Sequence, residues 1–322
     1  MGELQVETRT VAPRLLGLAS MLAYVVALGA WIAVMGIPRQ ALPAFGWIWL
    51  ATIAWNVQAP LPAHLDFARD WSLPLLALTV YLYSRGLADD LSFTSVHVTT
   101  PIEADRAMFG GTLPTEWLQG RLCGDPCLRS ASPRWYDVVL TTVYYSHFVV
   151  ALSIAGVLWV RNRASWVRFM RRYLSLNILA LVVYVTYPMA PPWLASQDGL
   201  ITDDISRITG RGWHDLRDGN FHQKLSAVGN PVAAMPSLHA GVALLVAVYG
   251  ISRLRSAARW LLLLYPAAMS FMLVYYAEHY VVDILAGFAA AGMVLWGCSW
   301  WERRHDSAPA RSHDREHQTV RR

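Results

Sequence analysis

The fold of this chain is indicated most clearly by the sequence around residue 160, which reads VVLTTVYYSHFVVALSIAGVLWV over 138–160 and RNRASWVRFMRR over 161–172. The first part contains no Asp, Glu, Lys or Arg, and about 20 apolar residues suffice for a helix to cross roughly 30 Å of hydrocarbon. The second part holds five arginines and no acid, which is typical of a short cytoplasmic loop beside a membrane helix. Together they predict a transmembrane helix that ends at the cytoplasmic side.

The same kind of uncharged run recurs along the chain, at 15–38, 40–65, 71–84, 138–160, 173–202, 225–252, 260–277 and 284–301. All but 71–84 reach 18 residues. That segment spans only if Asp70 and Arg85 extend their charges toward the interfaces, and otherwise it is re-entrant or lies in the interface. We therefore predict an all-α, polytopic membrane bundle of about eight transmembrane helices, or seven if 71–84 does not span.

Composition supports this class. The chain is 55% hydrophobic and 15% charged, whereas soluble domains carry about a quarter charged residues. These values exclude a disordered chain and a small disulfide scaffold, and with the long apolar runs they argue against a water-soluble enzyme. The 15 tryptophans fit a membrane protein, because Trp concentrates where hydrocarbon meets water.

Charge in the loops predicts the orientation. Segment 253–259 holds three arginines and no acid, and the tail after Trp301 has six arginines against four acids. Arginine-rich short loops stay in the cytoplasm, so we expect both termini inside, in the plasma membrane, and 85–137 and 190–235 outside. The resulting division is a scaffold over 1–85, an extracytoplasmic or interfacial loop over 86–136, a catalytic core over 137–301 and a disordered cytoplasmic tail over 302–322.

The outer loop 86–136 carries two features of its own. Cys123 and Cys127 form a disulfide if that compartment is oxidising, or remain as two thiols; a zinc site is disfavoured because no His lies close in sequence. Segment 101–109 alternates apolar and charged residues, which predicts either a helix lying on the outer leaflet or an ordinary helix packed on the bundle.

Two histidine motifs are expected at the same membrane depth. The run AAMPSLHA over 233–240 places Pro236, Ser237 and His239 where a helix starts, with Pro in its first turn. Free N–H groups make such an end an anion site. The run AEHYVVD over 277–283 sets His279 four residues before Asp283.

On a helix these two residues share one face, so the carboxylate accepts from Nδ1–H and leaves Nε2 for attack. Taken alone, His239 can also be interpreted as a capping or packing residue. His279 and Asp283 can likewise be interpreted as a buried polar pair. Their common depth favours a site at the outer face.

The motifs Met235-Pro236-Ser237-Leu238-His239 and His279-Tyr280-Val281-Val282-Asp283 resemble the last two signature motifs of the type-2 phosphatidic acid phosphatase superfamily. The resemblance is nearest to its inositol phosphorylceramide synthase-like branch, the inositolphosphotransferases, which has Leu between the Ser and the His. Met272 and Leu273 stand where the phosphatases carry a Ser-Arg pair. The run Tyr187–Trp193, YPMAPPW, and Tyr145-Ser146-His147-Phe148 are also similar to elements of that branch.

This resemblance implies a role for each matched position. His279 matches a nucleophile that forms a phosphohistidine, and Asp283 the residue that orients it. His239 matches the acid that protonates the leaving oxygen and then the base for the acceptor, while Ser237 matches a phosphate-contacting hydroxyl. It implies no metal, no cofactor and no nucleic-acid partner.

The basic phosphate ligands of the phosphatases are missing here, so other residues must bind the phosphoryl charge. The loop 190–235 offers Arg207, Arg211, Arg217 and Lys224, of which we favour Arg207 and Lys224; the alternative is that they pair with the loop acids Asp203, Asp204, Asp215 and Asp218. We also consider Tyr187 and His147 as substrate contacts, although His147 is equally readable as a satisfied bundle histidine.

The sequence thus predicts a membrane enzyme that moves a phospho-head group from a phospholipid or lipid-linked phosphate to an alcohol acceptor, such as inositol. With water as the acceptor it is a phosphatase, and the same histidines serve both reactions. A lipid or anion transporter is the rival of another class, but inverted repeats and helices broken at mid-membrane are not found. A structural partner with a decayed site is disfavoured by the intact His-His-Asp set.

Overall fold

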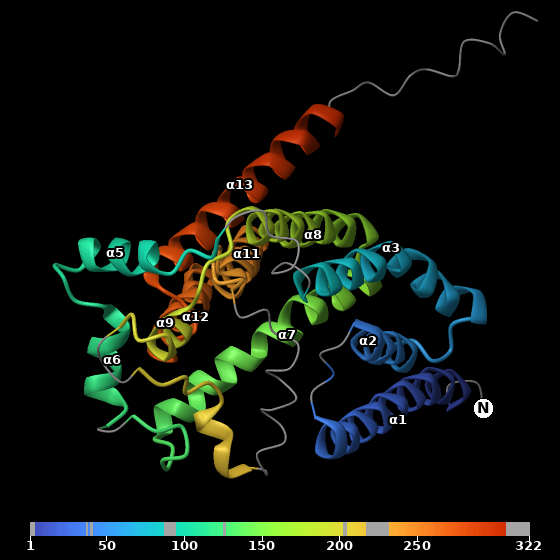
Figure 1. Cartoon of the computed structure of the whole chain (residues 1–322). Helices are drawn as coiled ribbons and strands as arrows, with labels where there is room; N and C mark the ends of the chain where they lie inside the picture. The colour runs from blue at the N-terminus through green and yellow to red at the C-terminus, as the bar shows by residue number, and fades with distance from the viewer. Residues whose placement is uncertain are drawn as a thin grey trace, which may run out of the picture.

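The computed structural model describes residues 4–36, 38, 41–86, 95–124, 127–201, 205–216 and 232–306. Within these ranges the chain folds into helices, and the sheet-like pairing consists of two isolated bridges, His97 with Met189 and Met189 with Ala233. Figure 1 shows the helices packed side by side, with α13 extending past the others. The predicted all-α class is confirmed.

The helices fall into three groups. The N-terminal group is α1 (Leu4–Met35), α2 (Ala41–Trp55) and α3 (Leu61–Gly86). Short outer elements are α5 (Thr99–Met108), α6 (Pro114–Leu122), α9 (Pro192–Gln197) and the 3-10 helix η1 (Arg211–Leu216). The central bundle consists of α7 (Trp135–Arg161), α8 (Arg163–Thr186), α11 (Leu238–Arg253), η2 (Ala257–Leu263), α12 (Leu264–Tyr275) and α13 (Val281–Asp306).

Among the described residues, five helical segments are long and apolar enough to cross a membrane: Leu15–Met35, Trp135–Arg161, Arg163–Thr186, Ala257–Tyr275 and Val281–His305. Two shorter apolar helices cover Leu42–Trp55 and Leu238–Arg253. These helices support an integral membrane protein, but the predicted count of eight is not confirmed. Segment 71–84 is the second half of α3, whose first half carries Asp66, Arg69 and Asp70 and so lowers its hydropathy.

Proline residues explain why two predicted runs are shorter as helices. The run 40–65 is interrupted after Trp55 and resumes at Leu61, directly after Pro60. The run 173–202 stops being helical at Thr186, because Pro188 lacks the N–H that would continue the ladder. The chain from there to Trp193 forms the bridged segment and the start of α9.

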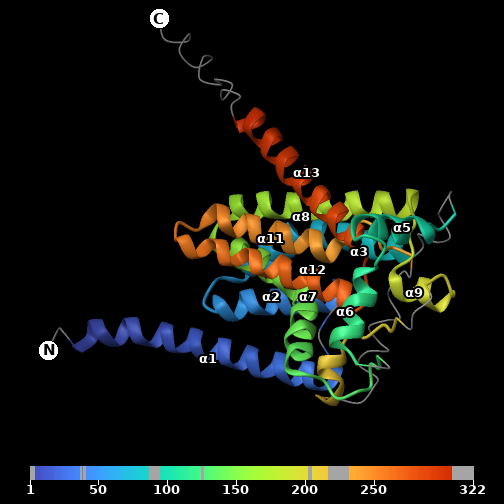
Figure 2. The ribbon, with the colours of Figure 1, turned by 90° about the vertical axis from the view of Figure 1, so that its left-hand side faces the viewer.

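The arginine-rich helix ends meet one another. Arg172 near the start of α8 forms an ion pair with Glu302 near the end of α13, at 2.7 Å between Nη2 and Oε2. Arg253 at the end of α11 donates to Ser165 Oγ at 2.9 Å. By contrast α5, α6 and α9 gather together at another end of the bundle in both views (Figure 1, Figure 2). The segments predicted to be cytoplasmic therefore lie in one region of the molecule, and α5, α6 and α9 lie in another.

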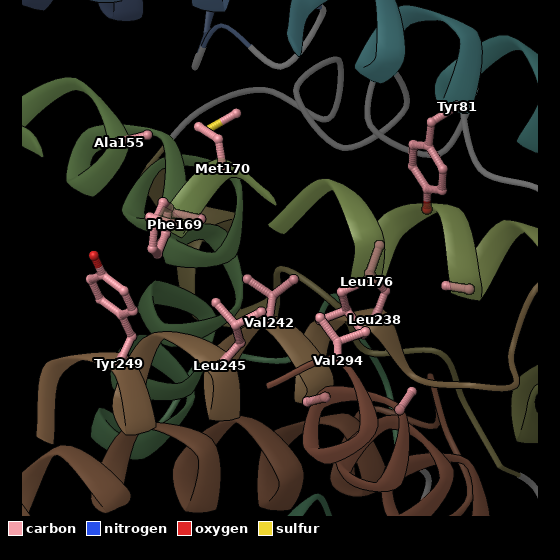
Figure 3. Close-up of a cluster of buried hydrophobic side chains, with 14 of the residues drawn as sticks. Tyr81, Ala155, Phe169, Met170, Leu176, Leu238, Val242, Leu245, Tyr249 and Val294 are labelled. Carbon is pink, nitrogen blue, oxygen red and sulfur yellow. The ribbon is translucent and has the colours of Figure 1, made fainter. Parts of the chain in front are cut away.

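The main core lies between α7, α8, α11 and α13. Phe169, Leu176 and Leu245 are buried there at the centre of a cluster that also includes Val242 and Val294 (Figure 3). Because α11 and α13 carry small residues at their contact, their backbones approach closely. A Cβ added to Gly241 would lie 3.0 Å from the Gly287 carbonyl oxygen. This contact fixes the relative position of the two helices that begin beside the histidine motifs.

Candidate active site

The first motif forms the entry to α11. Ser237 is the N-cap residue, fully buried, and its Oγ accepts from the backbone N–H of Ala240 at 3.4 Å. The helix begins at Leu238, so Pro236 precedes the cap; the expectation of Pro in the first turn is wrong. His239 is the second helical residue, because a Ser N-cap fixes the start of the helix at this point.

The second motif lies in the turn between α12 and α13. Ala277 has φ of 62°, and Glu278 N–H donates to the Leu273 carbonyl at 3.0 Å, which closes the end of α12. His279 therefore stands two residues before the first residue of α13, and the expectation that it shares a helix face with Asp283 is wrong. The two side chains still meet, at 3.4 Å between Nδ1 and Oδ2.

Asp283 holds this turn in place. Its Oδ2 also accepts from the Tyr280 backbone N–H at 3.0 Å, as an acidic residue in the first turn of a helix does when it reaches back to the cap. The Asp283 side chain is fully buried and that of His279 is 8% exposed. With Nδ1 directed to the carboxylate, Nε2 is the ring nitrogen that remains for chemistry.

The two motifs are joined by a backbone contact. Ser237 N–H donates to the Asp283 carbonyl at 2.9 Å, and a Cβ on Gly287 would lie only 2.3 Å from the Ser237 carbonyl oxygen. The rings of His239 and His279 consequently lie 6.1 Å apart, centre to centre. The structure thus brings together the three residues predicted as catalytic, together with Ser237.

Helix α7 supplies a third imidazole. His147 lies 4.2 Å from His239 between ring centres, and Tyr144 stacks on His239 at 5.1 Å with an interplanar angle of 18°. These contacts place His147 beside the site, one ring removed from His279. Its neighbourhood is aromatic, since Phe148 also contacts both histidines.

Arg207 reaches the site through Glu278. Its Nε and Nη2 bind the two carboxylate oxygens at 2.8 and 3.0 Å, and Thr209 Oγ1 donates to the same carboxylate. Burial opposes the charge of Glu278, but Arg207 and Thr209 hold the pKa of that carboxyl below its ordinary value. Arg207 is therefore paired with a neighbour of His279, whereas the side chains of the loop acids named above fall outside the described part of the structure.

The contacts of the other predicted ligands are with groups outside the two histidine motifs, where the structure describes them. Arg211 is buried, with Nε 3.5 Å from Asp137 Oδ2 and Nη1 3.3 Å from the Cys123 carbonyl. Tyr187 stacks on His97 at 3.9 Å. Cys123 and Cys127 form a disulfide, and Cys298 is free. Arg211 is thus bound beside that disulfide, whereas Lys224 and Arg217 fall outside the described residues.

Three charged residues near the site were not singled out by the sequence patterns. Glu278 was overlooked although it directly precedes His279. Arg129 is partly buried; burial and the nearby charge of Arg207 lower its pKa, although Tyr145 opposes this. Asp105 is fully buried on α5 and binds the first amides of α13. Ile102 and Asp105 are three residues apart, so they lie on one face of the helix over 99–108. This spacing was the sequence signal that could have identified Asp105.

In the described part of the chain, no group of three or more His, Cys, Asp or Glu side chains is arranged to hold a metal ion.

The fold and the paired histidine motifs define the class of this protein. It belongs to the PAP2 superfamily, whose family model matches residues 128–297, more than half of the chain. The family predicted from the two motifs is confirmed, and the match covers His147, His239, His279 and Asp283.

The chain is similar to a protein of Bacteroides thetaiotaomicron named phosphoinositol dihydroceramide synthase, at 28% identity over 177 residues. The alignment covers 52% of this chain and 57% of the relative, so the chain spans a little over half the length of the curated relative that it matches. This similarity agrees with the predicted inositol phosphorylceramide synthase-like branch. No solved structure gives a significant match.

Proposed function

We propose that this protein is a membrane phosphotransferase that moves a phospho-head group from a lipid donor to an alcohol, through a phosphohistidine on His279. The observation that carries the proposal is the 6.1 Å between the rings of His239 and His279, with Asp283 behind His279. An attacking atom approaches at about 3 Å, and a proton donor lies about 2.8 Å from the leaving oxygen. At this separation, one ring can therefore attack a phosphorus atom while the other donates a proton to the leaving oxygen on its opposite side.

In the first half-reaction, Nε2 of His279 attacks phosphorus while Nδ1–H donates to Asp283. The new N–P bond forms as the P–O bond to the donor's alcohol breaks, and His239 gives its proton to that oxygen. Asp283 stabilises the positive charge that develops on the His279 ring. The products are the free lipid alcohol and a His279 that carries the phospho-head group through the new N–P bond.

In the second half-reaction, neutral His239 takes the proton of the acceptor hydroxyl as its oxygen attacks phosphorus. The N–P bond then breaks, and both imidazoles return to their starting states. The name of the relative favours transfer to an alcohol over transfer to water. It makes phosphoinositol the first head group to test and a ceramide-type alcohol the first acceptor.

The phosphoryl charge is stabilised in this proposal by two groups. The N-terminus of α11 presents amides and a positive dipole end beside His239. Arg207 lies against Glu278 with a side chain that is 31% exposed, and its positive charge lies within reach of an anion bound beside Glu278. Both groups lie in the part of the protein that we assign to the extracytoplasmic face.

The test is transfer of label from a radiolabelled phosphoinositol lipid to the purified full chain in nanodiscs. Wild type is expected to trap acid-labile label, and His279→Gln to lose it and to lose at least about 10³-fold in turnover. His64→Gln, on α3 and away from the site, is the matched control. Equal labelling of wild type and His279→Gln overturns the mechanism. Mass spectrometry of the products then shows whether the acceptor is an alcohol or water.

A further inference from the structure

Asp105 on α5 is a buried carboxylate that the reaction above does not use. Its Oδ2 accepts from Val281 N–H at 2.9 Å and its Oδ1 from Val282 N–H at 3.0 Å. These are the first two amides of α13. Burial raises the pKa of Asp105, while the two amides act in the opposite direction. A carboxylate so buried is retained only where hydrogen bonds compensate for its lost hydration.

The first turn of α13 is thus capped by two carboxylates with separate tasks. Helix N-termini leave amides without intrahelical partners, and a nearby Asp side chain is drawn to them. Because Asp105 occupies Val281 and Val282, Asp283 is left to bind Tyr280 N–H and Nδ1 of His279. In the absence of Asp105, the amides of Val281 and Val282 would compete with His279 for the Asp283 carboxylate.

Asp105 also decides where an anion can bind. Because Val281 N–H and Val282 N–H donate to Asp105, these two amides of α13 are not available to a phosphate.

We infer that Asp105 is a positioning residue for His279, acting through the first turn of α13. Its effect on rate rests on the phosphohistidine mechanism proposed above, whereas its effect on the His279 ring does not. The helix α5 is accordingly part of the catalytic apparatus and not only a cover for the outer face. This places a determinant of the reaction in the loop 86–136, outside the residues matched by the family model.

The test compares Asp105→Asn with Glu103→Gln, which removes the same charge from an exposed position on α5. The hydrogen bond of the His279 ring to Asp283 is followed by the NMR signal of Nδ1 in histidine-labelled protein, with His279→Gln for assignment. The Asn side chain keeps the shape but has one acceptor oxygen in place of two, so Asp105→Asn frees an amide of α13 and the Nδ1 signal is expected to shift.

Turnover supplies the second readout. Asp105→Asn is expected to lower kcat by about 10- to 100-fold with little change in KM, because His279 loses its orientation. Asp105→Glu keeps both acceptor oxygens and is expected to keep the Nδ1 signal of His279. If Asp105→Asn matches Glu103→Gln in both the Nδ1 signal and kcat, the inference is wrong. A wild type without turnover overturns the proposed function instead, and the Nδ1 signal still decides the role of Asp105.

Discussion

At the scale of single residues, the site depends on how each charge is paired. Glu278 directly precedes His279, and Arg207 binds both of its carboxylate oxygens. The carboxylate thus keeps Arg207 within one residue of His279, the proposed nucleophile. Asp283 holds the His279 ring in place through its contact with Nδ1. Neither acid contacts the phosphorus in the proposed mechanism, yet both determine where the reacting groups stand.

The Glu278 pair makes a prediction about stability and pH. The pKa of Glu278 is lowered in the folded protein, so its stabilising contribution is present above its ordinary pKa and is lost as pH falls through the lower folded value. Glu278→Gln is expected to destabilise the protein by about 2 kcal/mol at pH 7, a value reduced from that of fully buried pairs because Arg207 is partly exposed.

The measurement is thermal unfolding of wild type and Glu278→Gln in detergent from pH 7 down to the acid limit of the protein. The difference between the two is expected to shrink below about pH 4.5 as the carboxyl of the unfolded chain takes up a proton. Glu103→Gln is the control and is expected to show no difference. A gap between wild type and Glu278→Gln that is constant with pH would contradict the ion pair.

At the scale of elements, the contact between α11 and α13 aligns the two histidine motifs. Both helices begin next to the site, and Ser237 N–H bonds the Asp283 carbonyl across their junction. Gly287 allows this approach, since any Cβ there would meet the Ser237 carbonyl oxygen at 2.3 Å. The distance between His239 and His279 therefore depends on the absence of a side chain at Gly287, six residues after the start of α13.

Gly287→Ala is accordingly expected to move α11 away from α13 and to lower kcat about 100-fold. The control is Gly292→Ala in the same helix, where an added Cβ has no heavy atom within 4 Å. Both variants gain the same helix propensity, so the comparison isolates the backbone contact. Kinetics at saturating donor would show the loss, and similar kcat values for the two variants would contradict the alignment argument.

At the scale of the whole molecule, the arginine-rich helix ends and the histidines occupy different regions. Arg172 and Arg253 connect the ends of α8, α11 and α13. The site is built from the opposite ends of α11 and α13, beside α5. With the positive-inside rule, this separation supports our proposal that the site faces the extracytoplasmic side.

Single cysteines test this orientation in intact cells, in a Cys298→Ser background that retains the disulfide. Thr112→Cys, exposed beyond α5, is expected to react with a membrane-impermeant maleimide, whereas Ala258→Cys, exposed in η2, should react only after lysis. Labelling of Ala258→Cys alone in intact cells would reverse the proposed topology.

Much of this architecture was predictable because membrane helices can be recognised from short stretches of sequence. Apolar length and arginine placement depend on neighbours in sequence, so the all-α class and the basic loops follow from composition over short windows. The motifs around His239 and His279 could likewise be recognised from the sequence, because helix starts have local signals. The helix limits were less so: Pro60 and Pro188 shorten runs that are uninterrupted in hydrophobicity.

The sequence by itself therefore determined the kind of bundle, the family and the identity of the paired histidines with Asp283. Only the tertiary structure decided that Glu278 receives Arg207, that His147 lies against His239, and that Asp105 caps α13. Each of these contacts joins residues far apart in the chain, and their partners are selected by which buried polar groups must be satisfied. That selection depends on where the helices pack, which no local pattern specifies.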